Sequence, residues 1–270
     1  MLFSFVVTSY NLEKYIKRCI DSLMNQSGDD YEILVVDDCS TDRTLGLLRE
    51  YKDIKLISLK ENRGCSFARN IGIAEASGDY ICIIDGDDYV TPSYLVELRK
   101  IIRDYSPDII AINALLTIGS FPFSYAFHAQ SGPLDYPFKV FETLVSPAQL
   151  FVVRRDLYQG VEFPVGKFFE DIFTLPKLIG KSSSLYLEST PLYCFQKNSE
   201  GSITYEMTQD KRNDYIESLS YLLLEYKDNL SDKAENNIRT MITSTLKGFE
   251  RKYGDSIKNY EKFLKNLFTK

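Results

Sequence analysis

The 270-residue chain contains no tryptophan, a single histidine and only five cysteines. The cysteines stand singly and form no CxxC pair, which argues against a disulfide framework and against a metal site built from thiolates. Reduced thiols are instead expected, as in a cytoplasmic protein. The histidine, His128, falls in an irregular stretch, where a structural role at the surface or in the core is favoured over metal ligation.

Positive charge is also scarce. The 32 Lys and Arg residues face 38 Asp and Glu residues, which gives a formal net charge of −6. A protein that binds nucleic acid through its phosphates needs a basic face, so nucleic acid is excluded as a partner. An anionic ligand would have to be held locally, by a bound cation or by backbone amides.

Long apolar runs are missing as well. No window approaches the ~20 apolar residues of a membrane-spanning helix. The apolar run at the N-terminus covers only about seven residues and lacks the flanking pattern of a signal peptide, so it is predicted to be a strand. We expect a soluble protein, or one attached to a membrane only at its surface.

The chain does contain a regular alternation of apolar strands and amphipathic helices. This alternation predicts βαβ units and hence an α/β fold with a mostly parallel sheet flanked by helices. Asn11 is placed to cap the first helix, and Pro92 falls in the first turn of the fourth. Strands are predicted at 2–8, 32–36, 55–59, 80–84, 108–113 and 150–153, and helices at 16–24, 41–51, 65–76 and 92–102.

The second half of the chain is less regular. Residues 114–147 show no clear period and are predicted to form hairpins and loops, and the sequence FFED at 168–171 is predicted to open a short helix. After about residue 205 proline is absent and helical spacing dominates. The sequence therefore predicts an α/β domain at 1–205 and a C-terminal helical region at 206–270.

An acidic cluster follows one of the predicted strands. The stretch YICIIDGDDYV, residues 80–90, ends an apolar run in Asp85, Asp87 and Asp88. Two other strands also end in small or acidic residues, TSYN at 8–11 and VVDDCSTDRT at 35–44, and the carboxyl ends of such strands form the ligand site of an open α/β sheet. Clustered carboxylates need a cation between them, and oxygen ligands select Mg²⁺ or Mn²⁺. The pattern predicts a metal that holds a phosphate group.

Each motif taken alone has a simpler interpretation. A DxD sequence after a strand is often only a solvated acidic turn, and the pair Asp37 and Asp38 could equally be the phospho-acceptor cluster of a receiver-like domain. An EF-hand loop is excluded because Tyr89 occupies a ligand position and no glycine follows it. The combination of motifs is more specific than any of its parts.

With these motifs in view, residues from about 2 to 203 resemble the inverting family 2 glycosyltransferases of GT-A fold. The resemblance is carried by blocks in the expected order: VVTSYN at 6–11, VVDDCSTDRT at 35–44, ENRGCSFARNIGIAEASGDYI at 61–81, DGDD at 85–88, ED at 170–171, and a YxF…GS stretch at 193–202.

The resemblance implies a site for a nucleotide-sugar donor. Thr8 and Tyr10 would frame the nucleotide base, typically uracil, and Asp38 would hydrogen-bond it, while Asp37 would share that contact or orient the loop. Arg69 would lie near the nucleotide or the diphosphate. Three other residues of its block, Asn62, Gly64 and Gly72, are expected to shape the turn and the packing of the helix.

The same resemblance assigns the remaining carboxylates. Asp85 would reach the ribose or the sugar, and Asp87, with Asp88 next to it, would bind the Mn²⁺ or Mg²⁺ ion that bridges the diphosphate. Asp171 would be the general base that activates the acceptor hydroxyl, and Glu170 would contact the acceptor or fix the loop. Without the upstream motifs, acids at a helix start would simply complement the helix dipole.

One block departs from the family pattern. Family members often carry a diphosphate-binding arginine in the stretch that corresponds to 193–202, whereas this chain reads YCFQKNSEGS there. Lys197 could supply the positive charge as a point cation, without the bidentate geometry of arginine.

The C-terminal region carries an amphipathic pattern at 253–267 within a locally basic stretch. From 247 to 270 there are seven Lys or Arg residues and three acidic ones. Two interpretations remain open: a helix packed on the domain with a solvated basic face, or a membrane-surface helix that brings the enzyme to a lipid-linked acceptor. The apolar stripe consists of Tyr253, Ile257, Tyr260, Leu264 and Leu267.

These features predict a metal-dependent inverting glycosyltransferase. The donor would be a nucleotide-diphosphate sugar, UDP-linked by resemblance, and the acceptor a glycan or a lipid-linked glycan reached from the cytoplasm or the inner face of the cell membrane. A nucleotidyltransferase is disfavoured because no glycine-rich loop follows the first strand. The non-enzymatic alternative is a degenerate family member that binds only a nucleotide sugar or a partner protein.

Overall fold

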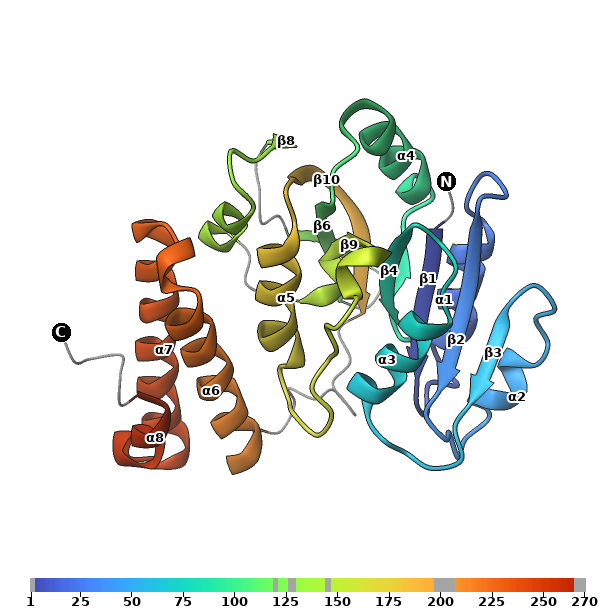
Figure 1. Cartoon of the computed structure of the whole chain (residues 1–270). Coiled ribbons are helices and arrows are strands. Elements are labelled where there is room, and N and C mark those ends of the chain that lie inside the picture. The colour runs from blue at the N-terminus through green and yellow to red at the C-terminus, as the bar shows by residue number, and fades with distance from the viewer. Residues whose placement is uncertain (1–2, 119–120, 126–129, 144–146, 197–206, 265–270) are drawn as a thin grey trace.

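The computed structural model describes residues 3–118, 121–125, 130–143, 147–196 and 207–264 (Figure 1). His128, Lys197 and the predicted domain boundary near 205 lie outside the described residues. Among the described helices, none combines the length and the apolar character needed to cross a membrane.

A ten-stranded sheet forms the centre of the described structure, in the order β3-β2-β1-β4-β9-β6-β10-β5, with β7 paired to β6 and β8 paired to β10. The first four strands in this order are parallel and agree with the predicted strands: β3 (Lys55–Ser58), β2 (Tyr31–Asp37), β1 (Phe3–Ser9) and β4 (Tyr80–Asp85). Every residue of β1 is buried, as expected for an apolar strand covered on both faces. The α/β fold is therefore confirmed.

The other half of the sheet is mixed rather than parallel. The strand β9 (Phe151–Arg154) runs antiparallel to both of its neighbours, β4 and β6 (Ile109–Ile118), while β10 (Leu185–Gln196) is parallel to β6. The irregular stretch after residue 113 prolongs β6 and then turns back in the hairpin strand β7 (Phe121–Tyr125). The remaining short strands are β5 (Tyr89–Val90) and β8 (Gly132–Pro133).

Helices cover the sheet and connect its strands (Figure 1). In the N-terminal half they are α1 (Ile16–Met24), α2 (Thr44–Leu48), α3 (Cys65–Glu75) and α4 (Tyr94–Tyr105), and α5 (Glu170–Lys181) follows in the second half. Short 3₁₀ helices are η1 (Pro137–Glu142), η2 (Ala148–Leu150), η3 (Arg155–Tyr158), η4 (Lys227–Asn229) and η5 (Ile257–Tyr260).

The helix α3 packs closely on β1 and β2 because one of its residues is a glycine. A Cβ atom on Gly72 would lie 2.3 Å from Cγ1 of Val6, which is far inside van der Waals contact. The structure thus gives Gly72 the packing role expected from the sequence.

Two local predictions about helix starts were wrong. The helix α1 has Tyr15 at its N-cap and no side-chain cap, and Asn11 instead accepts a hydrogen bond through Oδ1 from the backbone amide of Thr41 at 2.8 Å. Asn11 therefore joins the loop after β1 to the loop after β2, an interaction that local sequence does not reveal. The helix α4 begins at Tyr94, so Pro92 precedes it instead of lying in its first turn.

The C-terminal helices α6 (Gln209–Glu225), α7 (Asp232–Tyr253) and α8 (Glu261–Leu264) form a layer beside α5, on the opposite side of the molecule from β3 (Figure 1). The amphipathic helix predicted over 253–267 is interrupted near its start, because α7 ends at Tyr253 and Gly254 adopts a left-handed conformation, and Leu267 lies outside the described residues. Tyr260 and Leu264 of the apolar stripe are buried within the protein. Their burial agrees with the packed interpretation of this stripe.

Candidate active site

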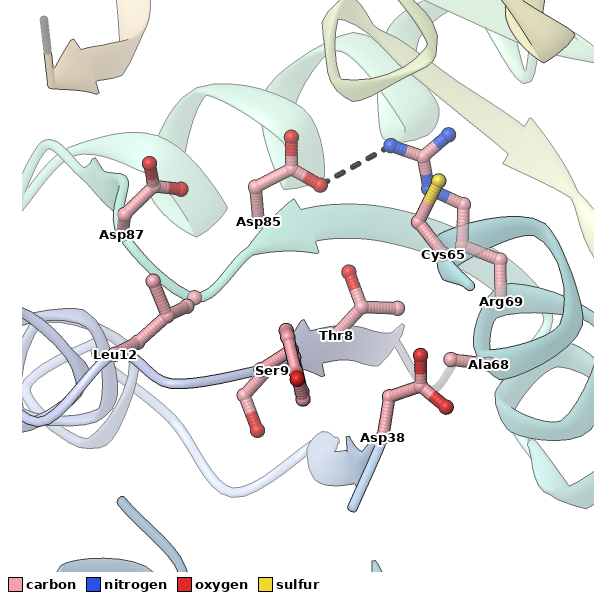
Figure 2. Close-up of a pocket in the computed structure, with 11 residues that line it drawn as sticks. Thr8, Ser9, Leu12, Asp38, Cys65, Ala68, Arg69, Asp85 and Asp87 are labelled. Atoms are coloured by element: carbon pink, nitrogen blue, oxygen red, sulfur yellow. Dashed lines mark hydrogen bonds and ion pairs between the residues drawn. The ribbon is translucent and has the colours of Figure 1, made fainter. Parts of the chain in front are cut away.

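A cavity of about 300 Å³ opens at the carboxyl ends of β1, β2 and β4 (Figure 2). Register places these ends together, since Thr8 pairs with Asp85 and Ser9 pairs with Asp37. A second cavity of about 420 Å³ shares Tyr10, Asp38 and Cys65 with the first and extends toward Glu170. Six of the predicted site residues line the first cavity: Thr8, Tyr10, Asp38, Arg69, Asp85 and Asp87.

The two aspartates after β2 have different surroundings. Asp37 is fully buried and accepts hydrogen bonds from the hydroxyls of Ser9 and Ser40 and from the Ser40 amide, so it shapes the loop. Asp38 lines both cavities, and its two carboxylate oxygens accept from the backbone amides of Arg63 at 2.8 Å and Gly64 at 2.7 Å. Asp38 therefore fixes the turn that starts α3 as well as facing the cavity.

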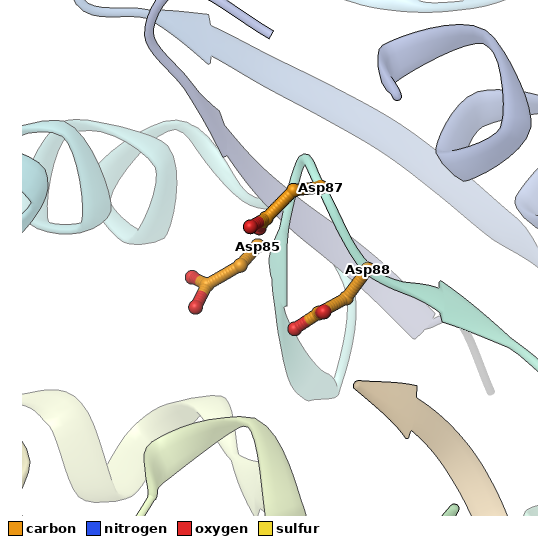
Figure 3. A group of neighbouring side chains, drawn as sticks. All are labelled: Asp85, Asp87 and Asp88. Carbon is orange, nitrogen blue, oxygen red and sulfur yellow. The ribbon is translucent and has the colours of Figure 1, made fainter. Parts of the chain in front are cut away.

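The acidic turn between β4 and β5 brings three carboxylates together (Figure 3). Asp85, Asp87 and Asp88 each offer a carboxylate oxygen, and these atoms lie within 4.8 Å of one another. The turn needs glycine at position 86, because a Cβ atom there would lie 2.8 Å from the backbone oxygen of Thr8. This set of oxygen ligands fits Mg²⁺ or Mn²⁺.

Asp88 is the most enclosed of the three acids. It accepts hydrogen bonds from the hydroxyl of Tyr193 at 2.8 Å and from the backbone amide of Gln196 at 2.7 Å. Burial, together with the neighbouring charges of Asp87 and Asp85, raises the pKa of Asp88 well above its ordinary value. A nearby cation would favour the charged carboxylate and so oppose this shift.

Arg69 is the centre of a buried ionic cluster at the wall of the first cavity. Its Nη1 donates to Asp171 Oδ1 at 2.9 Å and to Glu170. Its Nη2 donates to Asp85 Oδ1 at 3.1 Å, the contact drawn in Figure 2. Burial opposes the charge of the guanidinium, but the surrounding Asp171, Asp85 and Glu170 raise the pKa of Arg69 above its ordinary value. Arg69 thus connects the DGDD turn to the ED pair that begins α5.

The cluster makes the Asp171 carboxyl an unusually weak acid. One guanidinium faces three carboxylates, so the charges do not balance within the cluster. Burial and then the adjacent Glu170 raise the pKa of Asp171 from 3.8 to about 7, although Arg69 acts in the opposite direction. A carboxyl group with a pKa near neutrality is suited to accept a proton at physiological pH.

The structure brings most of the predicted residues to one place. Asp38 and Asp87 line the same cavity, and Asp171 is bonded to Arg69 in its wall. Asp37 and Asp88 are not among the residues that line this cavity, since Asp37 is bonded to Ser40 and Asp88 to Tyr193. Lys197 lies outside the described residues.

Gln149 and Cys65 also contact carboxylates of the site, and neither was predicted as a site residue. Gln149 of η2 donates through its amide to the carboxylate of Asp85, so that Gln149 and Arg69 together hold both oxygens of Asp85. Cys65 lines both cavities and donates from Sγ to Glu170 at 3.6 Å, and burial together with Glu170 raises the pKa of its thiol to about 12. Gln149 lies between the irregular stretch 114–147 and the predicted strand 150–153, without a pattern that marks it, whereas Cys65 stands within the ENRGCSFARN block.

Two glycosyltransferases are similar to this chain in sequence. The glycosyltransferase GlyA of Streptococcus pneumoniae serotype 4 is 26% identical over 234 residues, which are 80% of this chain and 33% of GlyA. The poly(ribitol-phosphate) β-N-acetylglucosaminyltransferase TarS of Staphylococcus aureus is 35% identical over 118 residues, which are 42% of this chain and 21% of TarS. The chain thus spans a third or less of the length of these relatives.

Solved structures share the fold. The crystal structure of S. aureus TarS 1–349 in complex with UDP-GlcNAc has a TM-score of 0.78 at 24% identity and covers 98% of this chain and 80% of that one. The mannosyltransferase PcManGT from Pyrobaculum calidifontis, in complex with GDP-Man and Mn²⁺, has a TM-score of 0.60 at 15% identity and covers 98% and 79%. The family model described as Glycosyl transferase family 2 matches residues 4–159, more than half of the sequence. This chain therefore belongs to glycosyl transferase family 2 and has the GT-A fold of that family's enzymes.

Proposed function

We propose that this chain transfers a sugar from a nucleotide-diphosphate donor to a hydroxyl group of a glycan or lipid-linked glycan, with inversion at the anomeric carbon. The observation that carries this proposal is the buried carboxyl group of Asp171, whose pKa is raised to about 7 and which is bonded to Arg69 in the cavity wall. A module that only binds a nucleotide sugar needs no such base.

In the proposed reaction, Asp171 removes the proton from the acceptor hydroxyl while that oxygen attacks the anomeric carbon and the nucleoside diphosphate departs. Arg69 orients the base through the 2.9 Å contact to Oδ1. Glu170 shares the same guanidinium and lines the second cavity, where we place the acceptor. One in-line displacement of this kind inverts the configuration.

We assign donor binding to the residues of the first cavity. Thr8 and Tyr10 frame the base with Asp38 beside them, and Asp37 orients the loop. Tyr10 is 45% exposed, which leaves its ring accessible to a planar base. Asp85, held by Gln149 and Arg69, faces the ribose or the sugar. The complex of TarS with UDP-GlcNAc supports UDP as the nucleotide to test first.

The acidic turn fits a divalent cation. We assign Asp87 and Asp88 as its ligands, with Mn²⁺ or Mg²⁺ as the ion. When bound, the cation would neutralise the charge that develops on the leaving diphosphate without a proton transfer. We also propose that Lys197 supplies a further positive charge to the diphosphate.

We further propose that the enzyme acts in the cytoplasm. All five cysteines are free thiols, which persist in a reducing compartment. An acceptor linked to a lipid would be met at the inner face of the membrane.

The experiment that tests the function measures the release of nucleoside diphosphate from a panel of nucleotide sugars, beginning with UDP-GlcNAc, in the presence and absence of Mn²⁺. We expect slow hydrolysis of at least one donor and faster turnover with its acceptor. A parent protein that binds a nucleotide sugar but releases no diphosphate with any donor or acceptor would favour the non-catalytic alternative.

A further inference from the structure

The segment that carries the ED pair is held by a helix outside the matched family region. The family model ends at residue 159, whereas α6 begins at Gln209. Asp214 on α6 accepts a hydrogen bond through Oδ2 from the backbone amide of Phe168 at 3.0 Å, and its Oδ1 accepts from Lys167 Nζ at 2.9 Å. Asp214 is buried, whereas the side chain of Lys167 is 36% exposed, so the carboxylate of Asp214 is the enclosed partner in these contacts.

A strained residue lies directly before the ED pair. Phe169 is the N-cap of α5 and has a φ of 57°, a left-handed conformation that is an outlier for a bulky residue. Such a conformation persists only where the surroundings fix it. The ring of Phe169 packs against the ring of Tyr215, the neighbour of Asp214 on α6, at a centroid distance of 4.6 Å.

The same helix also supports a wall of the second cavity. Lys167 donates to Glu217 at 3.0 Å as well as to Asp214, so two acids of α6 hold its ammonium group. Lys167 and Phe168 line the second cavity together with Glu170. The contacts therefore fix the stretch of chain that precedes the ED pair, and with it the direction in which α5 begins.

We infer that α6 is the positioning element of the base-bearing segment, with Asp214 and Tyr215 as its positioning residues. The inference rests on the proposed function, because it gives the C-terminal helical region a part in the same reaction. Asp214 fixes the backbone at Phe168, Tyr215 holds Phe169 in its left-handed conformation, and the chain then delivers Asp171 to Arg69. A small displacement of a reacting group is sufficient to reduce turnover strongly.

The test compares Asp214→Ala with Asp210→Ala, which removes an exposed aspartate from the first turn of the same helix. We expect Asp214→Ala to lower kcat about 10- to 100-fold, the scale of a misplaced catalytic group. The KM for the donor should stay within about threefold, because the first cavity is built on β1, β2, β4 and α3. Asp214→Asn, which keeps an oxygen for the Phe168 amide, should recover most of the lost kcat.

A second pair of variants keeps the inference testable if Asp214→Ala does not fold. Tyr215→Leu removes the ring that holds Phe169, whereas Tyr215→Phe retains it. We expect a lower kcat in the leucine variant and parental kcat in the phenylalanine variant. Equal kcat in Tyr215→Leu, Tyr215→Phe and the parent would overturn the inference, as would a folded Asp214→Ala enzyme with parental kcat.

Hydrogen exchange separates this inference from the proposed function, because it needs no activity. In Asp214→Ala, or in Tyr215→Leu if the first variant does not fold, the amides of Phe168 and Ile172, which donate to Asp214 and to the Phe169 carbonyl, should exchange at least about tenfold faster than in the parent. This is expected for the loss of a hydrogen bond to a charged group or of the packing that fixes the segment. Asp210→Ala should leave them unchanged. Unchanged exchange in the altered variant would overturn the inference even if the parent transfers sugar. If the variant exchanges faster but the parent shows no transferase activity, the role of α6 in fixing this segment is supported and only the proposed function is refuted.

Discussion

Replacing Asp171 with asparagine should stabilise the protein at neutral and alkaline pH while it removes activity. The folded protein holds this carboxyl with a pKa of about 7, compared with an ordinary value of 3.8. A group whose pKa is raised on folding stabilises the fold when it is protonated. Its contribution is fully present below pH 3.8 and is lost as the pH rises through about 7.

The size of the effect follows from this shift. Each pKa unit corresponds to about 1.4 kcal/mol, and the group is half titrated at pH 7, so the parent should lose roughly 2 kcal/mol between pH 5 and pH 7 from this group. Asparagine carries no titrating proton and still offers an oxygen to Arg69, whose guanidinium keeps Asp85 and Glu170 as partners. The difference in unfolding free energy between variant and parent should therefore grow with pH and level off above pH 7.

Urea denaturation of both proteins at pH 5, 6, 7 and 8 measures this difference, with Asp53→Asn as an exposed control. In parallel, transfer by Asp171→Asn should fall at least about 10²-fold with donor affinity within a few-fold of the parent. The parent's kcat should also decline below about pH 7 as Asp171 becomes protonated. A stability difference that does not change with pH, combined with unaltered turnover, would refute both the shifted pKa and the role as base.

Three further predictions concern the metal, the packing and the C-terminus. Asp87→Ala should abolish Mn²⁺-dependent UDP binding in calorimetry, and equal UDP affinity of the parent with and without Mn²⁺ would contradict the metal site. Gly72→Ala should lower the unfolding free energy by ~1–3 kcal/mol because the new Cβ would lie 2.3 Å from Cγ1 of Val6, whereas the control Gly46→Ala, with nothing within 4 Å, should not. The parent should not float with anionic liposomes because Tyr260 is buried, and its recovery in the lipid fraction would restore the membrane interpretation.

The sequence by itself determined the strands that build the site. Continuous apolar runs can be stable only as strands covered on both faces, and the polar residues that end them must then meet at one sheet edge. Thr8, Asp38 and Asp85 were therefore predictable, since their positions follow from local pattern and parallel pairing. The packing role of Gly72 was also predicted, and it follows from the close approach of α3 to β1.

Only the tertiary structure decided which distant residues meet. The partners of Arg69 at 170 and 171 lie about a hundred residues away, and no local periodicity encodes such a contact. Gln149 reaches Asp85 from a segment without a regular pattern. Asp214 accepts from the backbone amide of Phe168, and no sequence motif specifies the partner of a backbone amide. Hydrophobic periodicity reports burial along one element, whereas the pKa of a carboxyl group depends on the charges and the burial that the whole fold brings around it.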